Sequence, residues 1–202
     1  MWGNPDSDRA GQVTYGVAVL LLVAATDREL CGHDGLVCGV GPVEAAAATA
    51  RTLALHRFDA VLHVGLAGGR DVAIGSVVVG TEAVYRDLSA EWPVVDRVTP
   101  DAGLVERIRA ALPDAAAAPI HTSAAVGASS GTVSPGPLIE AMEGFGVLRA
   151  AERAGVPGVE VRVVSNELGE EDRSRWQLGA ALDALEDALP RIVRALVDAD
   201  AR

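Results

Sequence analysis

The chain has 202 residues, half of which are hydrophobic, and carries a formal net charge of −11 at pH 7. This composition suits one folded core and excludes a disordered chain, while 17 basic residues against 28 acidic ones exclude the basic surface on which nucleic-acid binding depends. Two cysteines, no secretory signal, and a longest apolar stretch (17–25) too short to cross a bilayer predict a cytoplasmic protein without a membrane partner.

Strand-like apolar runs alternate along the chain with alanine-rich helical segments, which is the pattern of an α/β domain with a mostly parallel sheet. We expect residues 1–11 to form a flexible N-terminus and residues 12–202 a single domain. The expected strands, in chain order, cover residues 13–24, 36–38, 60–64, 75–80, 121–126 and 159–165. The expected helices cover residues 43–56, 101–112, 140–154 and 174–197, with a kink or break at Pro190.

Glycine-rich turns are expected after two of these strands, at the edge where open α/β sheets bind ligands. The first is Gly-Val-Gly-Pro at residues 39–42, and the second is Gly-Leu-Ala-Gly-Gly at residues 65–69. A further loop, residues 127–132, contains Ser130 and Gly131 and offers backbone groups to a ligand. Glycine and proline at a helix start also serve ordinary capping, so the first turn has a purely structural alternative.

Two later segments carry the most specific pattern. Residues 141–147 read Ala-Met-Glu-Gly-Phe-Gly-Val, and residues 162–166 read Arg-Val-Val-Ser-Asn. A carboxylate from Glu143 and an amide from Asn166 at one sheet edge suit a site that holds a sugar and a base together. The two segments resemble the nucleoside phosphorylase/nucleosidase superfamily, and within it they are similar to the futalosine hydrolase family, whose members release hypoxanthine in a pathway to menaquinone.

The resemblance implies both a fold and an activity. The fold would be a three-layer α/β/α sandwich around a central mixed, mostly parallel sheet, with shortened loops. The activity would be hydrolysis of the N-ribosyl bond of a 6-oxopurine nucleoside. His63 and Leu66 replace the phosphate-holding residues of related phosphorylases, so water is the expected nucleophile. Subunits of the superfamily commonly pair, so we expect a homodimer or a higher homo-oligomer.

The resemblance also assigns roles to individual residues. Glu29, after the first strand, would activate water, and Glu143 would accept hydrogen bonds from the ribose hydroxyls. Asn166 presents two amide hydrogens, which suit a 6-oxopurine. The expected substrate-binding residues are Gly41, Gly65, Leu66, Ala67, Gly68, Ser130, Gly131, Met142, Arg162 and Ser165. No cofactor is expected, and no metal, because the four histidines show no ligand spacing.

Some residues near these motifs are expected to have only structural roles, and other functions are also compatible with the sequence. Asp27 and Arg28 are expected to be solvated, Asp172 to cap a helix, and Phe145 and Trp176 to lie in the core. The chain could instead be a methylthioadenosine/S-adenosylhomocysteine-type nucleosidase, a purine nucleoside phosphorylase, or a catalytically weak nucleoside-binding relative. Pyroglutamyl peptidases share a similar glycine turn, but the cysteine nucleophile that they need is missing here.

Overall fold

The computed structural model describes residues 13–15, 18–125 and 137–197. The expected flexible terminus and the loop residues Ser130 and Gly131 lie outside the described residues. The strands are β1 (Val13–Tyr15), β2 (Ala18–Ala24), β3 (Leu36–Val37), β4 (Ala60–Arg70), β5 (Val77–Tyr85), β6 (Arg97–Val98), β7 (Ala116–Thr122), β8 (Leu138–Ala141) and β9 (Gly158–Glu167). The helices are α1 (Pro42–Leu55), α2 (Ala102–Ala111), α3 (Gly144–Ala154) and α4 (Leu178–Val197), with short 3₁₀ turns η1 (Asp27–Leu30) and η2 (Arg173–Arg175).

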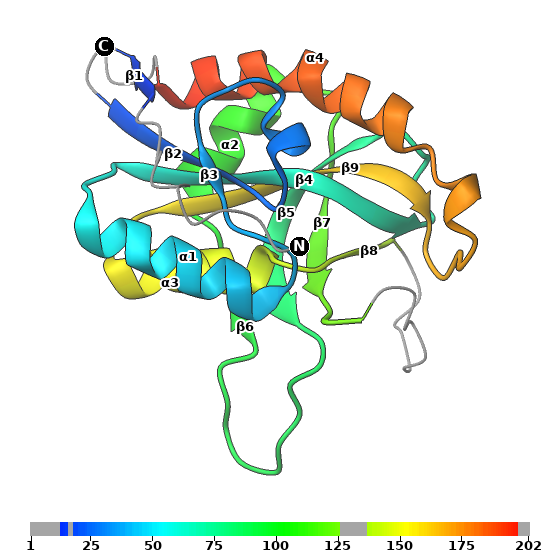
Figure 1. Cartoon of the computed structure of the whole chain (residues 1–202), viewed down its shortest axis with the longest axis horizontal. Helices are drawn as coiled ribbons and strands as arrows, with labels where there is room; N and C mark the ends of the chain where they lie inside the picture. Colours follow the sequence, from blue (N-terminus) through cyan, green and yellow to red (C-terminus); the bar gives the residue numbers. More distant parts are fainter. Residues whose placement is uncertain (1–12, 16–17, 126–136, 198–202) are drawn as a thin grey trace, which may run out of the picture.

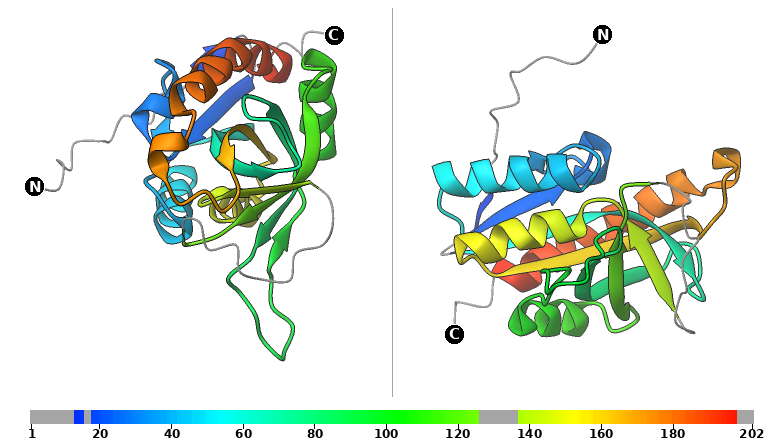
Figure 2. Two further views of the ribbon diagram at one scale, coloured as in Figure 1. Left: turned by 90° about the vertical axis from the view of Figure 1, so that its right-hand side faces the viewer. Right: turned by 90° about the horizontal axis from the view of Figure 1, so that it is seen from below.

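The strands form one mixed sheet with helices on both sides, which confirms the predicted α/β fold. Along the sheet the order is β1-β2-β4-β8-β7-β5-β6. Strand β9 pairs in parallel with β4 and antiparallel with β5, so β4, β8, β7, β5 and β9 close into a ring. The strands curl accordingly in the left view of Figure 2. Helices α2 and α4 pack together on one side, and α1 and α3 on the other (Figure 1).

Helix α4 covers one face of the sheet because its apolar residues recur every three or four positions. Leu185, Leu189 and Ile192 are fully buried on this stripe, against the valines of β9 that face the same layer. A kink or a break is predicted at Pro190, and the break does not occur, because α4 continues through this residue. Pro190 lies on the exposed face, where water can satisfy the carbonyl that loses its partner, and burial of the opposite face outweighs the lost hydrogen bond.

Two predicted boundaries were wrong in ways that matter for the site. The glycine-rich segment 65–69 is not a turn, because β4 continues to Arg70 and pairs with both β8 and β9 there. Residues 140 and 141 are not helical, because they pair with β4 and β7 as the end of β8. In both places pairing with neighbouring strands satisfies the backbone hydrogen bonds, and this tertiary context overrides the local propensity of the residues for a turn or a helix.

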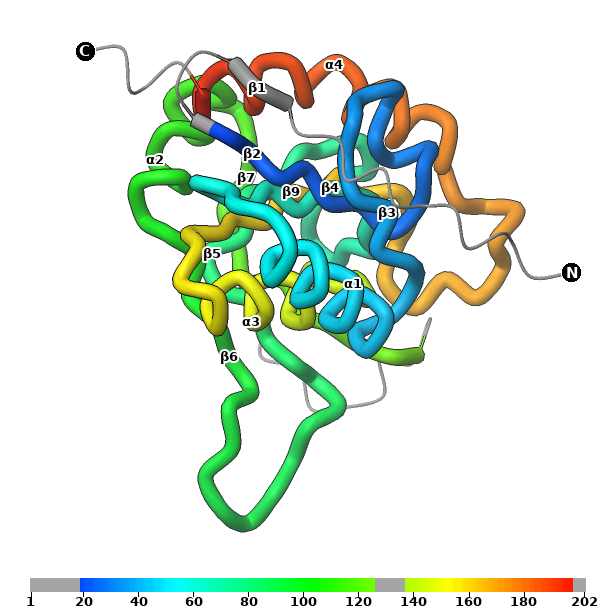
Figure 3. The backbone as a smooth tube through the Cα atoms, turned by 60° about the vertical axis from the view of Figure 1, so that its left-hand side comes forward, coloured from blue at the N-terminus to red at the C-terminus, as the bar shows by residue number. Residues whose placement is uncertain are grey.

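A long loop between β5 and β6, residues 86–96, extends away from the body of the protein (Figure 3). It carries Trp92, which is 69% exposed. No helix in the described ranges is long and apolar enough to cross a membrane.

Candidate functional site

A cavity of ≈ 360 Å³ brings together most of the predicted site residues. Its walls come from η1, the second half of β4, the junction of β8 and α3, the end of β9 and the start of α4. The predicted residues that line it are Glu29, Leu66, Ala67, Gly68, Met142, Glu143, Ser165 and Asn166. Gly41, Gly65 and Arg162 do not line the cavity but contact or make room for residues that do.

Glu29 is held in place by three donors from two elements. Its Oε2 accepts a hydrogen bond from the backbone N of Thr26 (3.0 Å), as in a capping box at the start of η1, and another from the Thr26 hydroxyl (2.7 Å). Its Oε1 accepts one from the backbone N of Leu66 (3.0 Å) on β4. Each carboxylate oxygen can accept about two hydrogen bonds, so Oε1 keeps an acceptor position. The sequence pattern did not indicate the part played by Thr26.

Glu143 lies at the N-cap of α3 and is 4% exposed. Its Oε1 accepts a hydrogen bond from the backbone N of Gly41 (3.2 Å), and its Oε2 accepts one from Nη2 of Arg162 (3.2 Å). Gly41 therefore acts through Glu143 in this structure. Its φ of 99° lies in the region that glycine favours, which explains why the turn before α1 needs this residue type.

Arg162 is fully buried beneath the cavity floor, between the two carboxylates. A Cβ at Gly65 would collide with Nη1 of Arg162 and lie 2.6 Å from Oε1 of Glu29, so the missing side chain leaves space that both groups border. Burial lowers the pKa of Arg162, but Glu160 and Glu143 raise it more, and the net shift is upward. The guanidinium thus stays charged, contacts Glu143 and lies within the electrostatic influence of Glu29.

Two further residues complete this buried cluster. Glu160 accepts a hydrogen bond at Oε1 from Nε of Arg162 (2.7 Å), a contact that the sequence motifs do not predict. The sequence does hold an indication of it: Glu160 is a charged residue two positions before Arg162, and residues two apart in a strand share a face, here of an otherwise apolar strand. His63 is fully buried against Arg162, and burial together with that guanidinium holds the pKa of His63 well below its usual range.

Asn166 has a fixed orientation at the end of β9. Its Oδ1 accepts a hydrogen bond from the Ser165 hydroxyl (2.8 Å), and its Nδ2 donates one to the carbonyl of Glu167 (2.9 Å). The sequence predicted two amide hydrogens for a ligand, whereas this arrangement leaves one. A Cβ at Gly68 would lie 3.1 Å from Nδ2, so the glycine keeps the nitrogen uncovered on the cavity side.

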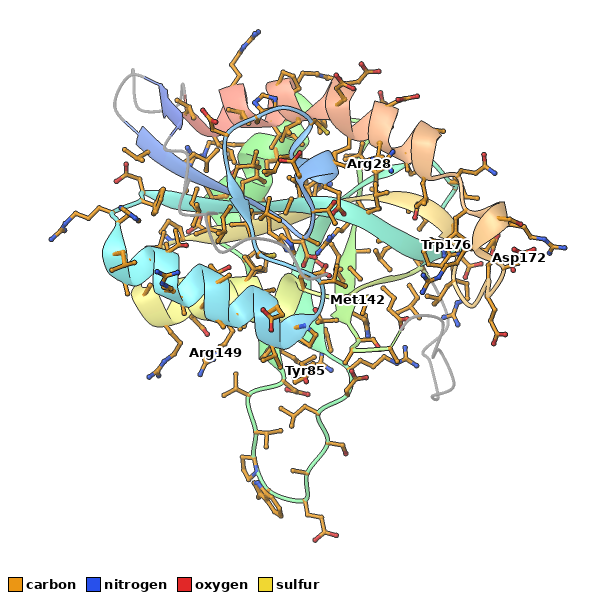
Figure 4. All side chains as sticks on the ribbon, viewed as in Figure 1. Arg28, Tyr85, Met142, Arg149, Asp172 and Trp176 are labelled. Carbon is orange, nitrogen blue, oxygen red and sulfur yellow. The ribbon has the colours of Figure 1, made fainter. Side chains whose placement is uncertain are left out.

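The outer wall differs in part from the prediction. Trp176 is half-buried rather than in the core, lines the cavity, and donates from Nε1 to the carbonyl of Glu170 (3.0 Å). Arg28 is exposed but also lines the cavity, unlike the solvated Asp27. In Figure 4, Arg28, Met142 and Trp176 come from different elements toward this end of the sheet. Asp172 caps η2 as predicted, accepting from the backbone N of Ser174 (3.0 Å), and Phe145 is buried.

Residues 35–198 match the Phosphorylase superfamily. The chain belongs to this superfamily. It is 39% identical over 191 residues to a futalosine hydrolase of Streptomyces coelicolor, an alignment that covers 82% of this chain and 80% of that protein. It is 30% identical over 183 residues to a futalosine hydrolase of Thermus thermophilus, with 80% and 81% covered. These relatives are hydrolases, and this member of the superfamily is a nucleosidase that acts on N-glycosyl bonds.

Solved structures share the fold of this superfamily member. A 5′-methylthioadenosine/S-adenosylhomocysteine nucleosidase from Neisseria meningitidis, in complex with methylthio-immucillin-A, superposes with a TM-score of 0.75 at 21% identity. The superposition covers 87% of this chain and 98% of that one. A futalosine hydrolase mutant of Helicobacter pylori gives a TM-score of 0.74 at 17% identity, with 86% and 97% covered.

Proposed function

We propose that this nucleosidase hydrolyses a futalosine-like 6-oxopurine nucleoside, releases hypoxanthine with water as the nucleophile, and serves a pathway to menaquinone. The observation that carries the proposal is the pair of carboxylates, Glu29 and Glu143, that line one cavity together with Asn166 and act electrostatically on the same buried guanidinium. The futalosine hydrolases at 30–39% identity support the choice of substrate class.

Glu29 would act as the general base. The remaining acceptor position on Oε1 receives a hydrogen bond from water, and the carboxylate takes a proton as the water oxygen attacks the anomeric carbon of the ribose. The bond between that carbon and the base nitrogen breaks, its electron pair leaves with the base, and the base anion takes up a proton from solvent to give hypoxanthine. The donors from Thr26 and Leu66 keep both oxygens of Glu29 in place during this step.

Glu143 would hold the sugar. A carboxylate accepts hydrogen bonds from two ribose hydroxyls and stabilises the positive charge that develops on the ring as the bond to the base breaks. Gly41 and Arg162 each donate to a different oxygen of Glu143, which orients the group without filling all its acceptor positions. Met142, beside it in the cavity wall, offers an apolar surface to the sugar.

Asn166 would read the base with the single amide hydrogen that its contacts leave. Ser165 holds Oδ1, so the group that faces the ligand is a donor. A donor suits ring nitrogen 7 and the 6-oxo oxygen of hypoxanthine, whereas a 6-amino group would meet it with another donor. An amide cannot protonate the leaving base, so the acceleration comes mainly from Glu29 and Glu143.

Two structural details support water over phosphate as the nucleophile. Leu66 presents an apolar side chain at the cavity, and its backbone N is already committed to Glu29. His63 is fully buried and contacts Arg162 instead of the cavity. Neither side chain offers a charged donor to an oxyanion.

The functional unit would be a homodimer or a higher homo-oligomer. Val40 and Val43 are 56% and 74% exposed where the chain enters α1, and Val40 also lines the cavity. Burial of these side chains against a second copy would remove apolar surface from water next to the site.

The test is to incubate the purified enzyme with a panel of nucleosides, including futalosine, inosine, methylthioadenosine and adenosine, and to identify products by mass spectrometry. We expect free hypoxanthine and a free ribose derivative from the 6-oxopurines, at a rate that added phosphate leaves unchanged. A ribose 1-phosphate product would contradict the hydrolytic mechanism, and release of adenine alone would contradict the base assignment.

A further inference from the structure

Glu160 is a buried carboxylate that the proposed reaction does not use directly. It is 1% exposed, and it is not among the residues that line the cavity. Burial raises the pKa of Glu160, against the opposing effect of Arg162. Taking a carboxylate out of water is costly, and well-packed hydrophobic residues often replace a buried ion pair without loss of stability. The presence of Glu160 in this strand therefore points to a use other than stability.

The surroundings of Glu160 hold its carboxylate in one place. His63 lies opposite it in the register between β4 and β9, with Nδ1 3.7 Å from Oε1 of Glu160. On the other side a Cβ at Gly144 would collide with the carboxylate, so the first residue of α3 leaves space that Glu160 fills. Oε1 is directed to Nε of Arg162 at 2.7 Å, and Oε2 has no hydrogen-bond partner among the described residues.

Two nitrogens of Arg162 donate to carboxylates, and the charge of a third carboxylate, Glu29, also acts on the guanidinium. Nε donates to Glu160 and Nη2 to Glu143, while Nη1 lies beside Gly65, where Oε1 of Glu29 also approaches. A guanidinium is planar and rigid, so holding Nε fixes the position of both terminal nitrogens. The contact with Glu160 thus helps to place Nη2 against Glu143 and Nη1 in the space beside Gly65 that Glu29 also borders.

We propose that Glu160 is a positioning residue that, by holding Nε of Arg162, places the guanidinium against the ribose-binding Glu143 and fixes its charge near the water-activating Glu29. The inference rests on the proposed nucleosidase reaction. Glu160 touches neither the water nor the nucleoside and acts through Arg162. Its loss should therefore affect the sugar and the attacking water and leave recognition of the base by Asn166 intact.

Two substitutions separate the effect of the negative charge of Glu160 from the effect of its side-chain length. Glu160→Gln keeps an oxygen within reach of Nε but removes the charge, and Glu160→Asp keeps the charge but withdraws it by one methylene group. A displacement of reacting groups by about 1 Å can cost about a hundredfold in rate, so we expect kcat to fall by about ten- to a hundredfold in both variants. Hypoxanthine and an inosine analogue with a cationic iminosugar ring serve as binding probes. Calorimetry should show weaker binding of the analogue and unchanged binding of hypoxanthine.

Thr49→Val is the matched control, because Thr49 is fully buried in α1 on the same side of the sheet and its hydroxyl has no partner among the residues described. It should keep wild-type kcat and affinity for both probes. Wild-type values in folded Glu160 variants, or equal losses for hypoxanthine and the analogue, would overturn the proposal. If Glu160→Gln does not fold, the kinetics and binding of Glu160→Asp test the proposal alone. If the wild-type enzyme releases no base from any nucleoside, the proposed function is refuted. The positioning role is then tested by the dissociation constants of hypoxanthine and of the analogue.

Discussion

Glu29 and Glu143 face one guanidinium from different elements, yet their other contacts differ. Glu29→Gln should reduce kcat by about 10²- to 10⁴-fold, because an amide cannot take the proton of water, while nucleoside binding largely remains. The NH₂ group of the glutamine must point at a backbone donor, either Leu66 N or Thr26 N, and this unfavourable contact should lower the free energy of unfolding by about 1–3 kcal/mol.

Glu143→Gln should weaken both binding and turnover, since it removes charge-assisted bonds to the ribose. Steady-state kinetics and nucleoside calorimetry on both variants check this, and wild-type turnover of Glu29→Gln would move the base role elsewhere.

Asn166 gives a second prediction, about the choice of base. Asn166→Asp would place an oxygen where Nδ2 now lies 2.9 Å from the Glu167 carbonyl, a position that favours a protonated carboxyl group. Such a group can donate to ring nitrogen 7 and accept from a 6-amino group, so the preference should shift toward 6-aminopurines by several-fold, in line with about 1–3 kcal/mol for an unpaired donor. The measurement is the ratio of kcat/KM for inosine and adenosine in both proteins. An unchanged ratio would show that Asn166 does not read the base.

The sequence predicted these three residues and several of their partners, such as Arg162 and Ser165, but not all of them. Glu29, Glu143 and Asn166 stand in recognisable local patterns, and eight of the predicted residues do line one cavity. Thr26, Glu160 and the buried position of His63 depend on which strands are neighbours, and no local pattern encodes that. Asn166 likewise keeps only one free amide hydrogen because the other is donated to the carbonyl of Glu167. That contact depends on the backbone conformation at the end of β9, which the motif does not specify.

Helix α2 lies on the opposite side of the sheet from α1 and α3, so its stability can be tested apart from catalysis (Figure 1). Asp101 is its N-cap and accepts from the backbone N of Leu104 (2.9 Å). Asp101→Ala should lower the free energy of unfolding by about 1 kcal/mol and leave kcat/KM unchanged. Urea denaturation and kinetics check the two parts. Asp101→Asn keeps a capping oxygen and serves as the control, and equal losses in both variants would rule out the cap as the cause.

Elements were predictable where the signal was local and strong. Helices α1 and α2 and the extent of β9 follow from apolar periodicity and caps, and they agree with the structure within about two residues. Strand β4 was cut short in the prediction because its second half contains three glycines, which normally indicate a turn. The glycines are tolerated in a strand here because large groups occupy their side-chain space, such as Arg162 at Gly65.

The association of subunits is expected to use the surface at the start of α1. Val43→Asp would place a charge in an apolar contact and should shift a homodimer toward monomer, measured by sedimentation at several concentrations. Leu55→Asp is the matched control, because Leu55 is 63% exposed at the far end of the same helix. A wild-type protein that sediments as a monomer throughout would contradict the expected dimer. Equal dissociation by both substitutions would place the interface elsewhere on α1.

Strand β9 has a further consequence for how the enzyme becomes active. It closes the ring between β4 and β5, and it also carries Glu160, Arg162, Ser165 and Asn166. Both partner strands, β4 and β5, come much earlier in the chain than β9. During synthesis the edges that pair with β9 therefore stay unpaired until residues 158–167 have been made. Pairings between such distant segments form slowly. A nascent or refolding chain therefore gains the site residues of β9 and covers the edges of β4 and β5 in one event, and recovered turnover reports the closing of the ring.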